Sequence, residues 1–227
     1  MKILAFVPAR GGSKGIKNKN LAMLGNKPLI YYTLQTVKKI KNKAFPFVST
    51  DSKKIKNYCE KNGFKSEYIR PKKLATDKSY VLSAIFHALT WLNKNKNLKF
   101  DAVMLFNPTS PIRKINEVNK IIDSFKRKKI NSIVSVTKMK EHPYECIKSN
   151  KVKWEYLQSS KKKITRRQNY PNNYFFIDGS IYLSKVSFLK KYNSFVVKNK
   201  TKLFKLSQYP SVDIDEIIDL KIAKLFI

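Results

Sequence analysis

The chain has 227 residues, of which 42% are hydrophobic and 12% aromatic, so it can form one well-buried core and is too apolar to be disordered throughout. Its two cysteines exclude a disulfide scaffold, and its apolar runs are too short to cross a bilayer or to form a secretory signal. We therefore expect a cytoplasmic protein without a membrane partner.

Basic residues dominate the charge, because 48 Lys and Arg face 15 Asp and Glu and give a formal net charge of +33. Such an excess favours either a polyanion partner or a surface that has accumulated lysine wherever lysine is tolerated. The lysines are spread through every segment and arginine, which reads base edges, is scarce, so we expect no specific nucleic-acid partner. A basic nucleic-acid-binding α/β protein remains an alternative that explains the charge directly.

Short apolar runs alternate with segments of helical periodicity along most of the chain. We expect strands at 3–7, 45–49, 102–106, 133–137 and 181–183. We expect helices over 28–37, 51–59, 79–92, 118–125 and 218–227. Asp51 or Ser52, and Ser79, are candidate N-caps of the second and third helices. Alternating, nearly all-apolar strands predict a three-layer α/β fold around a mostly parallel sheet.

The pattern weakens over residues 138–173, which are polar, rich in lysine and asparagine, and interrupted by Pro143 and Pro171. This stretch could form a lid, an extended arm or a subunit contact. We therefore divide the chain into a main domain, residues 1–137 and 174–227, and a small lobe, residues 138–173.

The loop after the first strand, PARGGSKGIKNKN at 8–20, is the first candidate site, since ligands of open α/β sheets bind beyond the carboxyl ends of the strands. Three glycines let the backbone approach a ligand, and Arg10, Lys14 and Lys19 add positive charge, a combination suited to a triphosphate. The spacing matches neither the Walker A loop nor the dinucleotide fingerprint. The alternative without a function is a basic turn exposed to solvent.

Two more motifs fall at predicted loop positions. Asn107 to Arg113, NPTSPIR, follows the third strand and offers hydrogen-bonding side chains at the same sheet edge. Asp213 and Asp215 precede the closing helix, and in an extended D-x-D both carboxylates point the same way. Two adjacent carboxylates near a triphosphate predict an Mg²⁺ site, the alternative being that Asp215 caps the helix.

Taken together, these motifs resemble the acylneuraminate cytidylyltransferase (CMP-sialic acid synthetase) family, including the CMP-legionaminic and CMP-pseudaminic acid synthetases. The resemblance covers the whole chain in collinear order. Its elements are ARGGSKGIKNKN at 9–20, STD at 49–51, RP at 70–71, LATD at 74–77, NPTSPIR at 107–113, RQ at 167–168, DGSIY at 178–182 and VDID at 212–215.

The resemblance implies a Rossmann-like domain of the nucleotide-diphospho-sugar transferase type and a homodimer, whose lobe reaches the partner's site. The implied reaction joins CMP from CTP to a 2-keto sugar acid and releases pyrophosphate. Nucleotide contacts are implied for Ala9, Arg10, Gly11, Gly12, Ser13, Asn20, Arg70, Ser79 and Asn107. Arg167 and Gln168 would face the sugar acid, and catalysis would rest on Arg10, Lys19, Asp213 and Asp215, the two aspartates binding Mg²⁺. Asp213 or a metal-bound water would take the proton.

Two positions depart from the family pattern. Asn107 stands where glutamine is common, one methylene shorter, and no cation lies in the residues just before Asp178-Gly179, where Arg or Lys would suit a sugar carboxylate. The sugar acid could be sialic, legionaminic or pseudaminic acid. CMP-Kdo synthetase is the alternative enzyme, but its loop usually reads A-R-x-x-S-x-R-x-P-G-K, unlike this one.

Overall fold

A computed structural model describes residues 1–227 except 14, 128–129, 151, 159–165 and 208–210. Its centre is a six-stranded sheet of order β10-β6-β9-β5-β1-β4. Parallel pairing joins β1 to β4, β1 to β5 and β10 to β6, whereas β9 runs antiparallel to both neighbours. The strands are β1 (Ile3–Pro8), β4 (Phe45–Ser49), β5 (Ala102–Leu105), β6 (Ser132–Lys138), β9 (Phe175–Lys185) and β10 (Lys202–Lys205).

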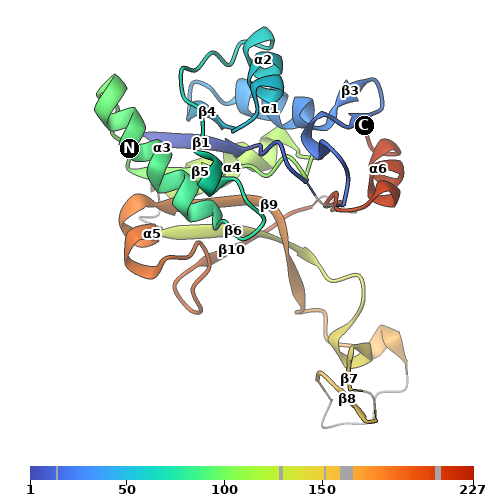
Figure 1. Ribbon diagram of the computed structural model, residues 1–227. Helices are drawn as coiled ribbons and strands as arrows, with labels where there is room; N and C mark the ends of the chain where they lie inside the picture. Colours follow the sequence, from blue (N-terminus) through green and yellow to red (C-terminus); the bar gives the residue numbers. More distant parts are fainter. Residues whose placement is uncertain (14, 128–129, 151, 159–165, 208–210) are drawn as a thin grey trace.

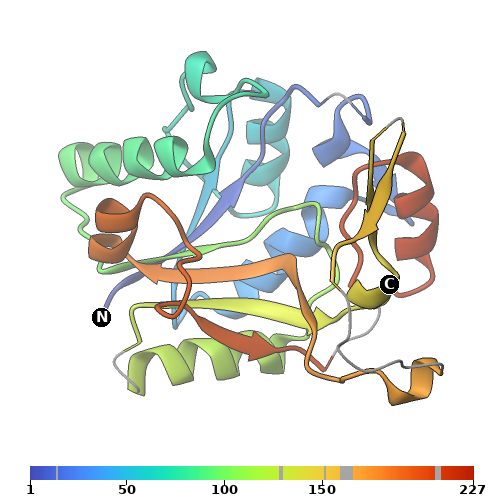
Figure 2. The same cartoon turned by 90° about the horizontal axis from the view of Figure 1, so that it is seen from below.

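Helices cover both faces of the sheet, as the alternation of strands and helices predicts (Figures 1 and 2). The helices are α1 (Leu29–Lys39), α2 (Lys53–Lys61), α3 (Val81–Lys96), α4 (Ile115–Arg127), α5 (Val186–Tyr192) and α6 (Ile217–Lys224). Ile3, Ala5 and Val7 of β1 pack with α1, α2 and α4, whereas Leu4 and Phe6 pack with α3 and α5. The mostly parallel, three-layer α/β fold is thereby confirmed.

Of the N-caps predicted for α2 and α3, one is confirmed and one is wrong. Ser52 caps α2, its Oγ accepting from Ile55 N at 3.4 Å. Ser79 does not cap α3, because the helix begins one residue later and Ser79 Oγ instead donates to Lys73 O at 3.0 Å. At α6 the capping box is formed by Glu216 and Asp219, so the carboxylate of Asp215 remains available for another role.

A small arm leaves the main domain where β6 ends and returns at the start of β9 (Figure 1). It carries β7 (Ile147–Ser149) paired with β8 (Trp154–Tyr156), and the short helices η3 (Pro143–Glu145) and η4 (Arg167–Asn169). At its base, the rings of His142, Tyr144, Tyr170 and Tyr174 lie 4.5 to 5.9 Å apart. The arm spans the residues assigned to the lobe.

A large bulge interrupts β9 where it passes the middle of β6. Val134 pairs with Tyr182 and Val136 with Ile177, so the four residues 178–181 lie opposite Ser135 alone. Gly179 has a φ of +72° within this bulge, a conformation that favours glycine. Bulges of this kind re-aim side chains beside functional sites, and this one holds the buried carboxylate of Asp178.

Among the described residues, no helix combines the length and apolarity needed to cross a membrane.

Candidate functional site

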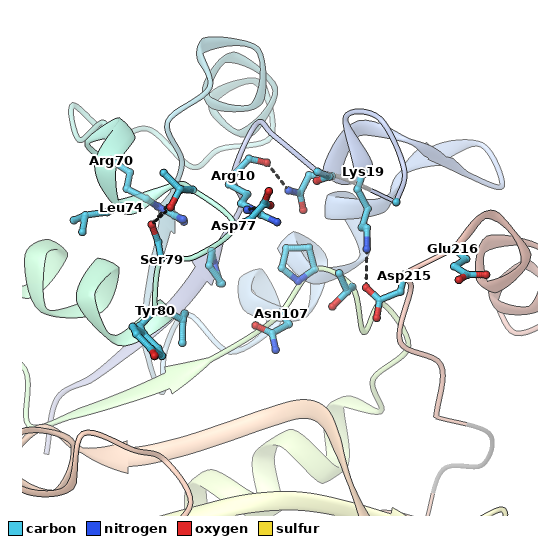
Figure 3. A pocket seen from close by; sticks show the side chains of 18 residues that line it. Arg10, Lys19, Arg70, Leu74, Asp77, Ser79, Tyr80, Asn107, Asp215 and Glu216 are labelled. Carbon is cyan, nitrogen blue, oxygen red and sulfur yellow. Dashed lines mark hydrogen bonds and ion pairs between the residues drawn. The ribbon is translucent and has the colours of Figure 1, made fainter. Parts of the chain in front are cut away.

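A cavity of about 630 Å³ opens beyond the carboxyl ends of β1 and β5 (Figure 3). Eight of the residues singled out from the sequence line it, although they come from five separate parts of the chain. They are Arg10, Ser13, Lys19, Asn20, Arg70, Ser79, Asn107 and Asp215. The structure therefore brings the cationic loop and the acidic C-terminal segment together around one space.

Backbone hydrogen bonds fix the loop that follows β1. Ala9 N donates to Ser49 O and Gly11 N to Asp51 Oδ1, each at 2.9 Å, and Asn20 Nδ2 donates to Arg10 O at 2.9 Å. Ala9, Gly11 and Gly12 are not among the residues that line the cavity. They shape the loop, whereas the side chains of Arg10, Ser13 and Lys19 reach the space itself.

Arg10 pairs with a carboxylate that sequence reasoning gave no role. Its Nη1 lies 2.6 Å from Asp77 Oδ1, and both side chains are about one-third exposed, at 33% and 39%. Asp77 lines the same cavity and belongs to the LATD element of the resemblance. A phosphate that binds Arg10 must compete with this carboxylate, so the ion pair is part of the site.

Lys19 ties the loop to the C-terminal segment. Its Nζ donates to Ile214 O and to Asp215 Oδ1, both at 2.8 Å. The backbones are close as well: a Cβ on Gly15 would lie 2.5 Å from Asp215 O. Lys19 is mostly buried, with a side chain 12% exposed, whereas Asp215 is 76% exposed and faces the open side of the cavity.

Arg70 is a buried residue that lines the cavity, next to the end of β4. Its Nε donates to Ser49 Oγ at 2.9 Å and its Nη2 donates to Ser49 O. Burial lowers the pKa of Arg70, while neighbouring Tyr68 and Asp51 act in the opposite direction. Arg70 therefore holds positive charge deep in the cavity with its orientation already fixed.

The two aspartates of the D-x-D motif line different cavities. Asp215 lines the first cavity, whereas Asp213 lines a second one of about 350 Å³, beside the ends of β6 and β9. Residues 211–215 form no strand, and Ile214 N donates to Thr109 O at 2.7 Å while Asp215 N bonds to Asp219 Oδ2 at 2.9 Å. The segment is thus not part of the sheet, and its shape is set by these two bonds.

Arg113 joins the walls of the two cavities, a role that sequence reasoning missed. Its Nη2 donates to Asn107 O at 2.7 Å and its Nε to Ser180 O at 2.9 Å, and Asn107 Nδ2 donates to Gly179 O at 3.2 Å. Burial lowers the pKa of Arg113, and the carboxylates of Asp178 and Asp213 raise it. The NPTSPIR loop and the β9 bulge are thus one hydrogen-bonded unit.

Arg167 and Gln168 do not reach either cavity within one chain. Both lie in η4 of the arm, where Arg167 Nε bonds to Glu145 Oε1 at 2.8 Å. Arg167 lines small cavities of the arm itself. Their expected contact with a sugar acid would therefore have to be made on another copy of the chain.

Oxygen ligands for a metal are sparse in the described part of the chain. It holds no group of three or more His, Cys, Asp or Glu side chains arranged to hold an ion. Magnesium usually needs only one or two carboxylates when substrate phosphates and water complete its shell. Asp213 accepts a single long hydrogen bond among the described residues, from Ser110 Oγ at 3.5 Å, so its carboxylate fits that need.

Comparison with known proteins gives consistent matches over the whole chain. The family model described as cytidylyltransferase matches residues 4–226. CMP-N,N'-diacetyllegionaminic acid synthase of Legionella pneumophila is 32% identical, over 96% of this chain and 93% of that protein. Post-translational flagellin modification protein B of Campylobacter coli is 28% identical, over 100% and 95%. Pseudaminic acid cytidylyltransferase of Campylobacter jejuni is 26% identical, over 99% and 96%.

A solved structure supports the fold independently. A CMP:2-keto-3-deoxy-manno-octonic acid synthetase complexed with CTP superposes with a TM-score of 0.69, covering 99% of this chain and 98% of that one. The sequence identity is 14%, so the likeness concerns the fold alone.

Gly15→Ala tests whether the loop and the C-terminal segment must touch. The added methyl would sit 2.5 Å from Asp215 O, far inside contact distance, so the two segments must separate. We expect affinity for CTP to fall at least about tenfold, measured by calorimetry, equivalent to about 1.4 kcal/mol.

Gly63→Ala is the matched control for that variant. Gly63 has a φ of +90° and does not line the cavity, so alanine there lowers stability without touching the site. Equal CTP affinity in the two variants would contradict the role assigned to Gly15.

Proposed function

The chain belongs to the cytidylyltransferase family, and from that premise we propose that it transfers CMP from CTP to the anomeric hydroxyl of a nonulosonic acid, releasing pyrophosphate. The observation that carries the proposal is the convergence of Arg10, Lys19 and Arg70 on one cavity. The loop after β5 hydrogen-bonds to Gly179 and Asp213, and Asp213 lines a second cavity. The first has the charge for a triphosphate, and the second has the space for the acceptor.

The sequence relatives favour a sialic-type acceptor. Proteins named for legionaminic, pseudaminic and neuraminic acid substrates match this chain at 26 to 32% identity. The octonic acid synthetase shares only 14%, so CMP-Kdo synthesis is the less supported alternative. A cytidylyltransferase also explains the glycine-rich loop, which the alternative of a nucleic-acid-binding protein leaves unexplained.

Group transfer of this kind depends on positioning and charge neutralisation. The anomeric oxygen forms a bond to the α-phosphorus as it loses its proton, and the bond from that phosphorus to the pyrophosphate oxygen breaks. Arg10 and Lys19 are placed to stabilise charge on the departing pyrophosphate, once they exchange Asp77 and Asp215 for phosphate oxygens. Asn20 and Asn107 are the proposed contacts of the cytidine end.

We propose Mg²⁺ as the cofactor, with Asp213 and Asp215 as ligands. Asp213 accepts one long hydrogen bond, from Ser110, and Asp215 is exposed, with its Oδ1 accepting from Lys19. When bound, the ion would neutralise charge on the transferred phosphate.

The decisive experiment is pyrophosphate release from CTP with a panel of N-acetylneuraminic, legionaminic, pseudaminic and octonic sugar acids. ATP, GTP and UTP serve as controls for the base, and EDTA for the metal. We expect release with CTP, a nonulosonic acid and Mg²⁺ together, and none when one is omitted. Release that does not depend on a sugar acid would contradict the proposal.

Asp215→Ala should abolish transfer while the fold survives. The change removes a proposed metal ligand and releases Lys19, and loss of one electrostatic group in such a site costs about 100-fold or more in rate. Asp123→Asn is the control, because Asp123 of α4 pairs with Lys43 and lines neither cavity. Near wild-type release by the alanine variant would remove Asp215 from the mechanism.

We also propose a homodimer in which the arm covers a second copy. Every residue of β7 and β8 is exposed, including Ile147, Trp154 and Tyr156. A lone two-stranded hairpin is at best marginally stable in water, so its apolar side chains need a partner surface. Such contact would carry Arg167 and Gln168 toward the site of another chain.

Trp154→Asp tests the dimer. Trp154 is 60% exposed in the single chain. A carboxylate at this position should therefore cost little stability in a monomer, but it should weaken an interface that buries it. We expect light scattering to show a dimer for the wild type and a monomer for the variant. A wild-type monomer, or an unaffected dimer, would refute this use of the arm.

A further inference from the structure

Asp178 is a buried carboxylate to which no role has been assigned so far. It is 3% exposed, sits in the β9 bulge, and lines the second cavity together with Asp213. Its Oδ1 is well bonded, accepting from Ser135 Oγ at 2.5 Å and from Ser180 N at 3.2 Å. One side of the carboxylate is therefore held rigidly by the bulge.

The other oxygen has no partner. Asp178 Oδ2 is a buried side-chain atom without a hydrogen bond among the residues that the structure describes. A buried carboxylate oxygen left unpaired is costly, and it is normally matched by a donor or a cation. Asp178 thus carries an unsatisfied buried oxygen in the wall of the cavity that Asp213 also lines.

The carboxylate of Asp213 lies beside the backbone of the bulge that carries Asp178. A Cβ on Gly179, the neighbour of Asp178, would lie 3.8 Å from Asp213 Oδ2. Both aspartates also act on the same guanidinium, since each raises the pKa of Arg113. Two carboxylates that line one cavity favour the binding of positive charge there.

Arg113 does not make the missing contact. Its Nε, Nη1 and Nη2 donate to Ser180 O, Thr33 Oγ1 and Asn107 O, all neutral acceptors, at 2.7 to 3.0 Å. No ion pair within the described part of the chain involves Asp178 or Asp213. Lys138 and Lys140 also line the cavity, but both are exposed.

We propose that Asp178 and Asp213 form a two-carboxylate site for a divalent cation at the wall between the two cavities. Hard oxygen donors on a rigid bulge suit Mg²⁺ or Mn²⁺, which take one or two carboxylates and fill the remaining positions with phosphate oxygens and water. The inference rests on the proposed function in one respect, that the phosphates of CTP would complete the shell. Asp178 thereby becomes a metal ligand that the D-x-D motif alone does not predict.

Binding of Mn²⁺ to the full chain tests the site. Electron paramagnetic resonance of the free ion, with CTP present, measures this binding. Asp178→Asn keeps an Oδ1 that can accept from Ser135 and Ser180 and replaces only the unpaired oxygen. We expect its dissociation constant for Mn²⁺ to rise at least about tenfold, and that of Asp213→Asn likewise. Asp123→Asn, which removes the same charge from a surface pair with Lys43, should bind as the wild type does.

Thermal unfolding without metal separates ligation from folding. Because Asp178→Asn removes an uncompensated buried charge, the variant should unfold no earlier than the wild type, and added Mn²⁺ with CTP should raise its unfolding temperature less. Mn²⁺ affinity within twofold of wild type in Asp178→Asn would overturn the inference. Pyrophosphate release by the wild type, measured in the same preparation, tests the proposed function separately, since it does not depend on which residue holds the ion.

Discussion

The ion pair between Lys19 and Asp215 is the contact on which the site depends, because it joins the loop after β1 to a segment almost two hundred residues later. Arg10 and Asp77 repeat the arrangement on the other side of the same cavity. In the protein without nucleotide, each of these two cations is thus held in place by a carboxylate. Half-exposed pairs of this type contribute about 0–1 kcal/mol, so a triphosphate with several charges can displace them at small cost while finding the cations already oriented.

Much of this arrangement follows from local sequence. The all-apolar run of β1 forces a central strand, and a loop rich in glycine and cations directly after it must lie at the carboxyl edge of the sheet. The meeting of Arg10 and Asp215 at one cavity could be inferred from that edge and from the resemblance. Sequence reasoning failed where tertiary contacts decide. Asp213 and Asp215 line different cavities in a segment that a bond from Ile214 N to Thr109 O holds in place, and that distant contact has no local signature.

The missed residues share the same explanation. Arg113 and Asp77 each have a partner 67 residues away, Ser180 and Arg10 respectively, so no spacing rule marks these contacts. Strand β10 was not predicted because only four residues form it and three of those are exposed, leaving no apolar run to detect. The bulge of β9 could not be predicted from the sequence either. A glycine within a strand pattern has several explanations until its φ is known.

The excess of lysine makes the retained acidic residues informative. In a chain with 48 basic and 15 acidic residues, carboxylates recur at positions with a definite structural task. Asp51 holds the Gly11 amide, Asp77 and Asp215 hold the two phosphate-facing cations, and Glu216 with Asp219 begins α6. Asp178 differs from all of these. Its Oδ1 accepts a hydrogen bond from Ser135, whereas its Oδ2 has no hydrogen-bond partner among the described residues. If drift toward lysine removed acids wherever they were dispensable, the survival of this buried, half-satisfied carboxylate beside Asp213 argues that something outside the chain completes it.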